Sequence, residues 1–509
     1  MPVDERSFDE NNVLRSRTLT EWTVHGPVAT NDPIRPANSL AQRDPQVART
    51  VSVIIENGQA LATLSENEYE RPGVNNNTAP TDAEYFAHLN LKRTKSHHFR
   101  NIPLSLAQTG TFSQIAGYFN SSTIATIGET DYAYIPDYKA RGINSLPTES
   151  RALDKEGNVL TKTQTLFDEQ NYLGASSGYL SGNLVSTWTD PSTDLSIPAN
   201  SRLLRGKPTT TKLWNNETNS WISSCVQYDQ YGSPRKAWEP NEDYNSSRFT
   251  ETEYSSDYGF AYPTKVTTPP PDPTNTHGTN SGSFITTSYD FMTGLPLTVS
   301  NEFGQTTKTE YNDALLRPTK VYGLSDFTIP IAETIYDDIA RTVKVRKQLD
   351  SMNWDESTTY ADSMGRSVKT VANDSQGDVI VETKYDLLGR VQMVSNPYRQ
   401  GDLVLWSLKE YDEAGRVKQT REPVAGQNPS SPTGNILGTS GFDISTAPDA
   451  LGTVITTTNA ASKKSRSISN ALGQLIAVDE PDSTGALPAL PQSTPVPSPT
   501  PSGTPSPHG

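Results

Sequence analysis

The amino-acid sequence predicts an all-β protein made of successive antiparallel β-hairpins that form a curled sheet or a partial β-spiral shell. In residues 379–394, apolar and polar side chains alternate on both sides of a turn at 386–389, which is the pattern of a half-buried hairpin. Between positions 289 and 411, the tyrosines that end such strands stand 22 to 26 residues apart, a period typical of repeat proteins. The composition agrees, because 22 tyrosines and only 33% hydrophobic residues suit sheets with one hydroxyl-rich face.

Residues 1–130 are expected to form an irregular, β-rich N-terminal region. The alternating run 50–55 followed by Asn57-Gly58 predicts a hairpin, because Asn-Gly readily adopts the positive φ angles of a type I′ turn. We expect a mobile loop at 71–78. The start of the chain lacks a signal peptide, and residues 8–12 look like a turn inside a repeat, so we expect the chain to begin partway into a longer protein.

His97 and His98 stand in the one local basic cluster, among lysines and arginines at 92–100. A metal or anion site is one interpretation of this cluster. No partner ligands stand at metal-binding spacing, however, so we expect a solvated loop.

Residues 131–240 contain divergent copies of the repeat, and the clear series begins at their end with Tyr228, Asp229 and Gly232. Residues 241–285 are expected to form a hairpin with a proline-rich excursion at 267–278, because proline cannot donate a hydrogen bond to a sheet.

Residues 286–480 hold the regular repeats, with an interruption expected at 428–443. The residues that define these repeats are Tyr289, Asp290, Gly304, Tyr311, Tyr336, Asp337, Tyr360, Gly365, Arg366, Tyr385, Asp386, Gly389, Arg390, Tyr411, Asp412, Gly415, Arg416, Gly452 and Gly473. Asp is expected to bind backbone N–H groups of the turn, and Gly to supply the positive φ. Residues 481–509 form a Pro/Ser/Thr-rich tail that we expect to be disordered.

The hexapeptide Tyr-Asp-x-x-Gly-Arg at this spacing resembles the YD repeats of bacterial RHS-type proteins, which also occur in the shell of Tc toxins and in teneurins. The clear resemblance covers residues 228–474. It implies a shell that encloses a C-terminal cargo, often a toxin, and an extracellular or cell-surface location. This chain departs from the family's pattern, because no Asp-Pro-x-Gly-Leu motif follows the repeats and the tail stands where a cargo would begin. A truncated or orphan shell segment therefore fits best.

The charge and the apolar pattern exclude several kinds of partner. A net charge of −15 argues against nucleic acid, whose binding requires lysine and arginine to neutralise phosphates. We expect no membrane span, because no stretch reaches the ~20 apolar residues that one requires. Cys225 is the single cysteine, so no internal disulfide is possible, and we expect it to be a small buried residue on a strand.

Motifs that could carry chemistry are few. Residues 174–178, around Ser176, match the Gly-x-Ser-x-Gly nucleophile elbow, but that motif requires a sharp turn from a strand into a helix. We expect a loop there instead. Residues 374–378 lack the spaced acidic series of a calcium loop and predict a plain turn. The sequence therefore nominates no catalytic residue, no metal ligand and no cofactor.

The resulting hypothesis is a non-enzymatic structural or interaction protein, a segment of an RHS-type shell associated with toxin encapsulation or export. Its partners would be the rest of a longer shell or a toxin cargo. The alternative is a cell-surface carbohydrate-binding or adhesion module, in which rows of tyrosines stack on sugar rings and glycans are the partners. A hydrolase is a third, weaker alternative. We favour packing as the role of the tyrosines, because packing requires equal spacing in every repeat.

Overall fold

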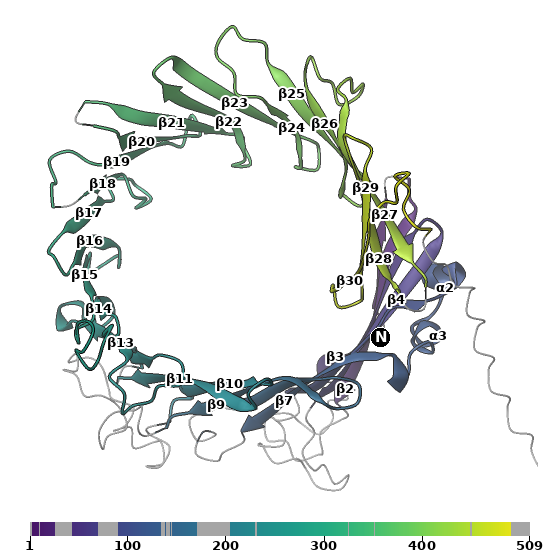
Figure 1. Ribbon diagram of the computed structural model, residues 1–509, viewed down its shortest axis with the longest axis horizontal. Helices are drawn as coiled ribbons and strands as arrows, with labels where there is room; N and C mark the ends of the chain where they lie inside the picture. Colours follow the sequence, from purple (N-terminus) through teal and green to yellow (C-terminus); the bar gives the residue numbers. More distant parts are fainter. Residues whose placement is uncertain are drawn as a thin grey trace, which may run out of the picture.

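One antiparallel sheet contains every strand that the computed structural model describes (Figure 1). The structure describes residues 3–9, 11–25, 43–69, 90–133, 138, 143, 145–169, 204–229, 232–323, 325–350, 352–447 and 450–489. The loop expected at 71–78, Ser176 and the end of the tail from residue 490 lie outside these residues.

The described residues form 30 strands. The first third comprises β1 (Val3–Phe8), β2 (Leu14–His25), β3 (Arg43–Glu56), β4 (Gln59–Tyr69), β5 (Leu91–His97), β6 (Arg100–Asn101), β7 (Ile124–Ala133), β8 (Leu146–Leu153), β9 (Val159–Phe167) and β10 (Pro208–Asn215). The second third comprises β11 (Ser220–Tyr228), β12 (Pro234–Trp238), β13 (Phe249–Tyr254), β14 (Pro263–Thr267), β15 (Phe284–Tyr289), β16 (Pro296–Asn301), β17 (Thr306–Glu310), β18 (Lys320–Tyr322), β19 (Ala332–Asp337) and β20 (Thr342–Gln348). The last third comprises β21 (Trp354–Ala361), β22 (Ser367–Asp374), β23 (Gly377–Tyr385), β24 (Val391–Ser395), β25 (Leu405–Tyr411), β26 (Val417–Ala425), β27 (Ile436–Ser445), β28 (Gly452–Asn459), β29 (Lys464–Ser469) and β30 (Leu475–Asp479). The helical elements are α2 (Leu104–Thr109), α3 (Phe112–Ala116) and the 3-10 turns η1 (Ser121–Thr123) and η5 (Ser256–Tyr258).

The strands pair in chain order from β1 to β30, except that β5 pairs with β7 and the short β6 pairs with β4. This ribbon of hairpins curls around a wide central opening (Figure 1). No backbone pairing joins β1 to β30 in the described part of the chain, so the sheet is not closed. The predicted fold class, a curled sheet of successive antiparallel hairpins, is confirmed.

The largest core lies at β2–β4. Val51, Val53 and Ile55 alternate along β3 and pack beneath α2 and α3, which lie on the outer side of the ribbon (Figure 1). Ile54 and Leu61 belong to the opposite face of the same hairpin. The predicted turn is confirmed, with φ of 48° at Asn57 and 76° at Gly58. The two short helices were not predicted, because five or six residues carry too little periodicity to be recognised.

Two interruptions of the repeats were predicted, and they differ in outcome. The proline-rich segment leaves the ladder between Thr267 and Phe284, as expected. The predicted interruption at 428–443 is wrong in its second half, because β27 begins at Ile436 and pairs with both β26 and β28. Backbone pairing on both sides here outweighs the low strand propensity of its glycines.

Successive turns of an antiparallel ribbon alternate between its two edges. The Tyr-Asp turns all follow odd-numbered strands between β11 and β25, so they share one edge, which we call the tyrosine rim. The turns at 9–13, 57–58, 154–158 and 301–305 lie on the other edge, which we call the opposite rim.

Candidate functional site: the tyrosine rim

Each regular turn is closed by its aspartate. In the 386–390 turn, one carboxylate oxygen of Asp386 accepts the backbone N–H groups of Leu388 (3.0 Å) and Arg390 (2.9 Å). The other oxygen accepts the Nε–H of Arg390 at 2.6 Å. Gly389 takes a φ of 83°, which allows its N–H to donate to the carbonyl of Asp386. The turns that begin at Asp362 and Asp412 repeat this arrangement.

The turn carboxylates are held in their charged form. The hydrogen bond from Arg317 lowers the pKa of Asp313 to about 2, and the one from Arg366 lowers the pKa of Asp362. Burial works against ionisation at Asp386, but the N–H and guanidinium of Arg390 still leave its pKa lowered. Carboxylates with lowered pKa values and fixed partners suit structural ion pairs rather than general acid–base catalysis.

Tyrosine hydroxyls tie each hairpin to the one before it. Tyr385 donates to the carbonyl of Ser367 at 2.8 Å, and Tyr411 to that of Val391 at 2.6 Å. Both acceptors are the first residue of the preceding returning strand. Five further bonds of this kind run from Tyr228 to Pro208, Tyr254 to Pro234, Tyr289 to Pro263, Tyr311 to Pro296 and Tyr336 to Pro318. The recurring proline is a signal in the sequence that the turn motif alone does not include.

Arginines of the turns stack on the next aromatic ring along the rim. The guanidinium carbon of Arg366 lies 4.3 Å from the ring centre of Tyr385, and that of Arg390 lies 4.3 Å from Tyr411. Arg317 over Tyr336 (4.0 Å) and Arg416 over Phe442 (3.9 Å) continue the row. Cation–π stacking and the hydroxyl bonds thus occupy these rings, which leaves them poorly suited to stack on sugars.

Several predicted repeat residues depart from this pattern. Tyr360 stands two residues before its aspartate, Asp362, rather than one, so Ala361 takes the place of the tyrosine. A one-residue offset turns a side chain to the other face of a sheet, and Tyr360 indeed lies beside Lys369 there. Gly452 is not a turn residue: it opens β28 opposite Ser445, where a Cβ would clash with the carbonyl oxygen of Ser469.

The remaining repeat residues close turns of related geometry. Asn301 and Asn470 replace the aspartate in the turns that contain Gly304 and Gly473. The turn after Tyr336-Asp337 has Arg341 rather than glycine at positive φ. The turn after Tyr289-Asp290 is one residue longer and uses Gly294, while Asp229 and Gly232 close the first regular turn.

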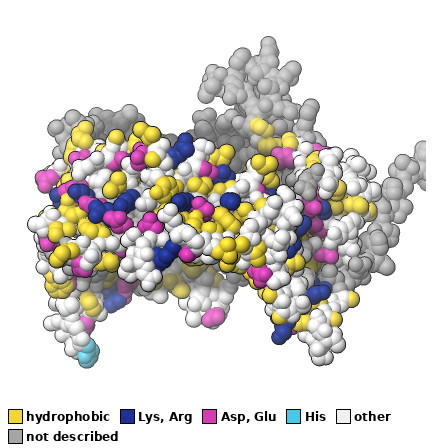
Figure 2. All heavy atoms as spheres, turned by 90° about the horizontal axis from the view of Figure 1, so that it is seen from above, with side chains coloured by type: hydrophobic (Ala, Val, Ile, Leu, Met, Phe, Trp, Pro, Cys, Tyr) yellow, Lys and Arg dark blue, Asp and Glu magenta, His cyan; other side chains and the backbone are white. Residues whose placement is uncertain are grey.

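The two faces of the ribbon carry different chemistry. Glu333, Arg346 and Glu356 form a row of ion pairs, with separations of 3.0 and 2.7 Å, on the face that also bears α2 and α3. Figure 2 looks onto the outer side of this arc and shows Lys and Arg beside Asp and Glu along the strands. The adjacent row, on the inner face, is uncharged and consists of Thr334, Val345, Ser357, Ala372 and Val379.

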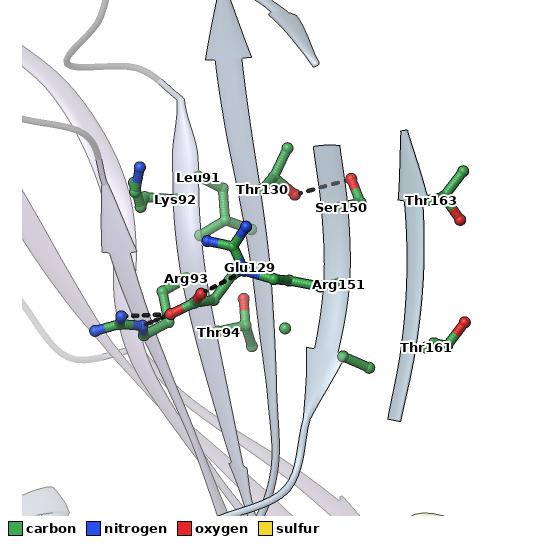
Figure 3. Close-up of a pocket in the computed structure, with 12 residues that line it drawn as sticks. Leu91, Lys92, Arg93, Thr94, Glu129, Thr130, Ser150, Arg151, Thr161 and Thr163 are labelled. Atoms are coloured by element: carbon green, nitrogen blue, oxygen red, sulfur yellow. Dashed lines mark hydrogen bonds and ion pairs between the residues drawn. The ribbon is translucent and has the colours of Figure 1, made fainter. Parts of the chain in front are cut away.

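A shallow depression of about 300 Å³ lies over β5, β7, β8 and β9 (Figure 3). Arg93 and Arg151 point toward the buried Glu129, and Arg151 donates to it at 2.9 Å. Burial alone would raise the pKa of Glu129. The hydrogen bonds from the two arginines lower it by more than that, so the pKa is lowered overall and the carboxylate stays charged. Lys92 and Lys95 pair with Asp131 and Glu68 in the same way, so the cations at 92–95 of the basic cluster are each paired with a neighbouring acid.

The prediction that His97 lies in a solvated loop is wrong. His97 ends β5 and is buried, with Nδ1 2.8 Å from the Thr123 hydroxyl and Nε2 3.2 Å from the Glu66 carboxylate. Cys225 is buried on β11, 3.6 Å from the Thr210 hydroxyl. Within the described ranges, no group of three or more His, Cys, Asp or Glu side chains could hold a metal ion, and no helix is long and apolar enough to cross a membrane.

The ends of the ribbon overlap edge on edge, with the last hairpins lying over β3 and β4 in the axial view (Figure 1). Ile444 and Leu451 near the tyrosine rim pack against Leu61 and Phe99 near the opposite rim. Next to this contact, Arg416 pairs with the buried Glu56 at 2.7 Å. The overlap is thus made by side chains, with apolar contacts beside ion pairs.

No family model matches the chain, and no curated protein matches it. Among solved structures it is similar to the crystal structure of TcdB2-TccC3, with a TM-score of 0.43 and 11% identity over 93% of this chain and 26% of that chain. It is also similar to the Tc holotoxin pore of Photorhabdus luminescens, with a TM-score of 0.30 and 11% identity over 92% of this chain and 24% of that one. The chain therefore spans about a quarter of the length of the proteins that it matches.

Proposed function

We propose that this chain is a non-enzymatic wall segment of an RHS-type shell that encloses a polypeptide cargo, a toxin in the family that its repeats resemble. The observation that carries the proposal is the difference between the two faces of a one-layer ribbon. Paired charges cover the outside. On the inside, two rows across β19–β23 hold only Tyr, Thr, Val, Ser and Ala, and a third row carries the opposite charges of Lys347 and Asp355 side by side.

An inner wall with few charges suits contact with a polypeptide of any sequence. Hydroxyl and small apolar groups can touch a polypeptide without selecting for its charges. The partners would be the cargo and the rest of a longer shell, and an extracellular or cell-surface location is part of the proposal. The glycan alternative loses its main support, because hydroxyl bonds and arginines occupy most tyrosines of the rim.

The inner wall can be tested with an unfolded probe chain. Reduced, carboxymethylated α-lactalbumin carrying a fluorophore would be titrated with the full chain, and binding measured by anisotropy. Val345→Glu places a charge on the inner face and should weaken binding, whereas the matched Thr358→Glu on the outer face should not. Absence of binding to the parent chain, or equal loss in both variants, would contradict the proposal.

A further inference from the structure

Outside the overlap of the two ends of the ribbon, the turn tips of the tyrosine rim carry large apolar side chains. From β15 to β24 these include Met292, Leu315, Ile339, Met364, Leu387 and Leu388. Ile339 is 95% exposed and Leu387 is fully exposed. Tips of tight turns normally hold Asn, Asp, Ser or Gly. Large exposed apolar side chains that recur at successive turns along one edge therefore indicate a site of association.

The opposite rim carries apolar tips over the same strands. Phe303 is 78% exposed, Met352 86% and Leu403 71%. These residues lie in the turns after β16, β20 and β24, between the tyrosine-rim turns. Both edges of one arc therefore carry exposed apolar side chains, although the turn after β22 on the opposite rim is polar, with Ser375 and Gln376 at its tip. The turn after β8, by contrast, presents Lys155 and Glu156.

The overlap within the chain shows how two rims fit. At the tip of the turn after β25, Glu413 lies 3.7 Å from Arg15, which follows a turn of the opposite rim. Arg416 of the same turn reaches Glu56 beside another opposite-rim turn. A tyrosine rim thus already seats on an opposite rim, and its turn-tip residues take part in the contact.

We propose that the apolar arc is an interface between copies of this chain, in which the tyrosine rim of one copy seats on the opposite rim of the next. A second copy presents turns at the same spacing and curvature, and its opposite rim carries Phe303, Met352 and Leu403 over the same arc. The contact would extend the edge-on-edge mode already present in the overlap. Because the two surfaces differ, the association is heterologous and adds copies along the ring axis. This inference does not depend on the proposed cargo.

The experiment is sedimentation velocity of the full chain over a concentration series. One variant carries Met364→Ser, Leu387→Ser and Leu388→Ser on the tyrosine rim. A second carries Phe303→Ser, Met352→Ser and Leu403→Ser on the opposite rim. A control carries Lys155→Ser and Glu156→Ser at a polar turn. Circular dichroism melts establish that all four proteins are folded, which is expected because every substituted side chain is exposed.

The parent and the control should form larger species as concentration rises, and each rim variant alone should lose every species above the monomer. An equimolar mixture of the two rim variants should recover a dimer and nothing larger, because each supplies the one rim that the other lacks. A parent that stays monomeric at the highest concentration overturns the proposal. A rim variant that dimerises by itself overturns the head-to-tail geometry.

Discussion

At the scale of single residues, the repeat is a turn in which each recurring residue has a separate role. Aspartate satisfies the backbone N–H groups, arginine binds that aspartate and covers the next tyrosine, and glycine supplies a positive φ. Gly389 has a second requirement, because a Cβ there would lie 3.1 Å from the guanidinium of Arg366. Conformation and space thus both favour glycine at this position.

These two requirements can be separated by a pair of alanine substitutions. Gly365→Ala places an L-residue at a φ of 78° with open space around its Cβ, which should cost about 1–2 kcal/mol. Gly389→Ala adds the contact with Arg366, so it should lower the free energy of unfolding further. Urea denaturation of both variants measures the difference. Equal losses would show that space at residue 389 is not limiting.

The turn aspartates should give the protein an acid-sensitive stability. The folded-state pKa of Asp313 is about 2, below the ~3.9 of an unfolded chain. The contribution of the charged Asp313 to the free energy of unfolding is therefore complete above about pH 4 and is lost as the pH falls toward 2. Asp313→Asn keeps an acceptor for the backbone, as Asn301 and Asn470 do, but removes this titration.

Urea midpoints measured from pH 7 to pH 2 test this expectation. The parent should lose more stability than Asp313→Asn below about pH 4, because only the parent must protonate a carboxylate held in an ion pair. Parallel pH profiles for the two proteins would exclude Asp313 as a source of the acid sensitivity.

At the scale of elements, tyrosine hydroxyls join hairpins that backbone pairing already links. Tyr411→Phe removes the 2.6 Å bond to Val391 and leaves the stack with Arg390 in place. We expect a loss of about 0.5–1.5 kcal/mol in the free energy of unfolding. Tyr360→Phe is the matched control, because its hydroxyl bonds to no other described residue, and it should stay within about 0.5 kcal/mol. The same loss in both variants would contradict a role for the hydroxyl.

The sequence predicted those elements whose geometry depends on residues close to one another along the chain. The hydrogen bonds of a turn such as 386–390 are made within the turn, so its own residues are sufficient to predict its geometry. The inserted Ala361 shows the limit, since the letters around Tyr360 look alike while its side chain faces the other way. Gly452 was misread because Asp-x-x-Gly also occurs where the chain enters a strand. The burial of His97 and the ion pairs of Glu129 depend on strands brought together by the sheet, which no local pattern encodes.

At the scale of the whole molecule, the overlap couples residues that are far apart in the chain. Leu61 and Leu408 are both fully buried. Leu61 belongs to a cluster with the C-terminal hairpins, whereas the apolar cluster of Leu408 is formed by β24, β25 and their loop. Replacing either by alanine should cost about 2–5 kcal/mol. Leu61→Ala should also speed amide hydrogen exchange in β27, whereas Leu408→Ala should affect only the strands near it. Unchanged exchange in β27 after Leu61→Ala would show that the overlap adds no stability.

Because β30 does not pair with β1, the number of hairpins in the ribbon can change by duplication within the gene. A closed barrel must keep its strand number and shear, so one added hairpin disrupts every register. Here the described chain has no ladder from β30 back to β1, and a duplicated unit would leave all existing registers intact. It would, however, bring the preceding turn to the overlap, so that Arg15 would meet Leu387 in place of Glu413. Selection on the number of units would therefore act through a few charged residues at the overlap rather than through the sheet.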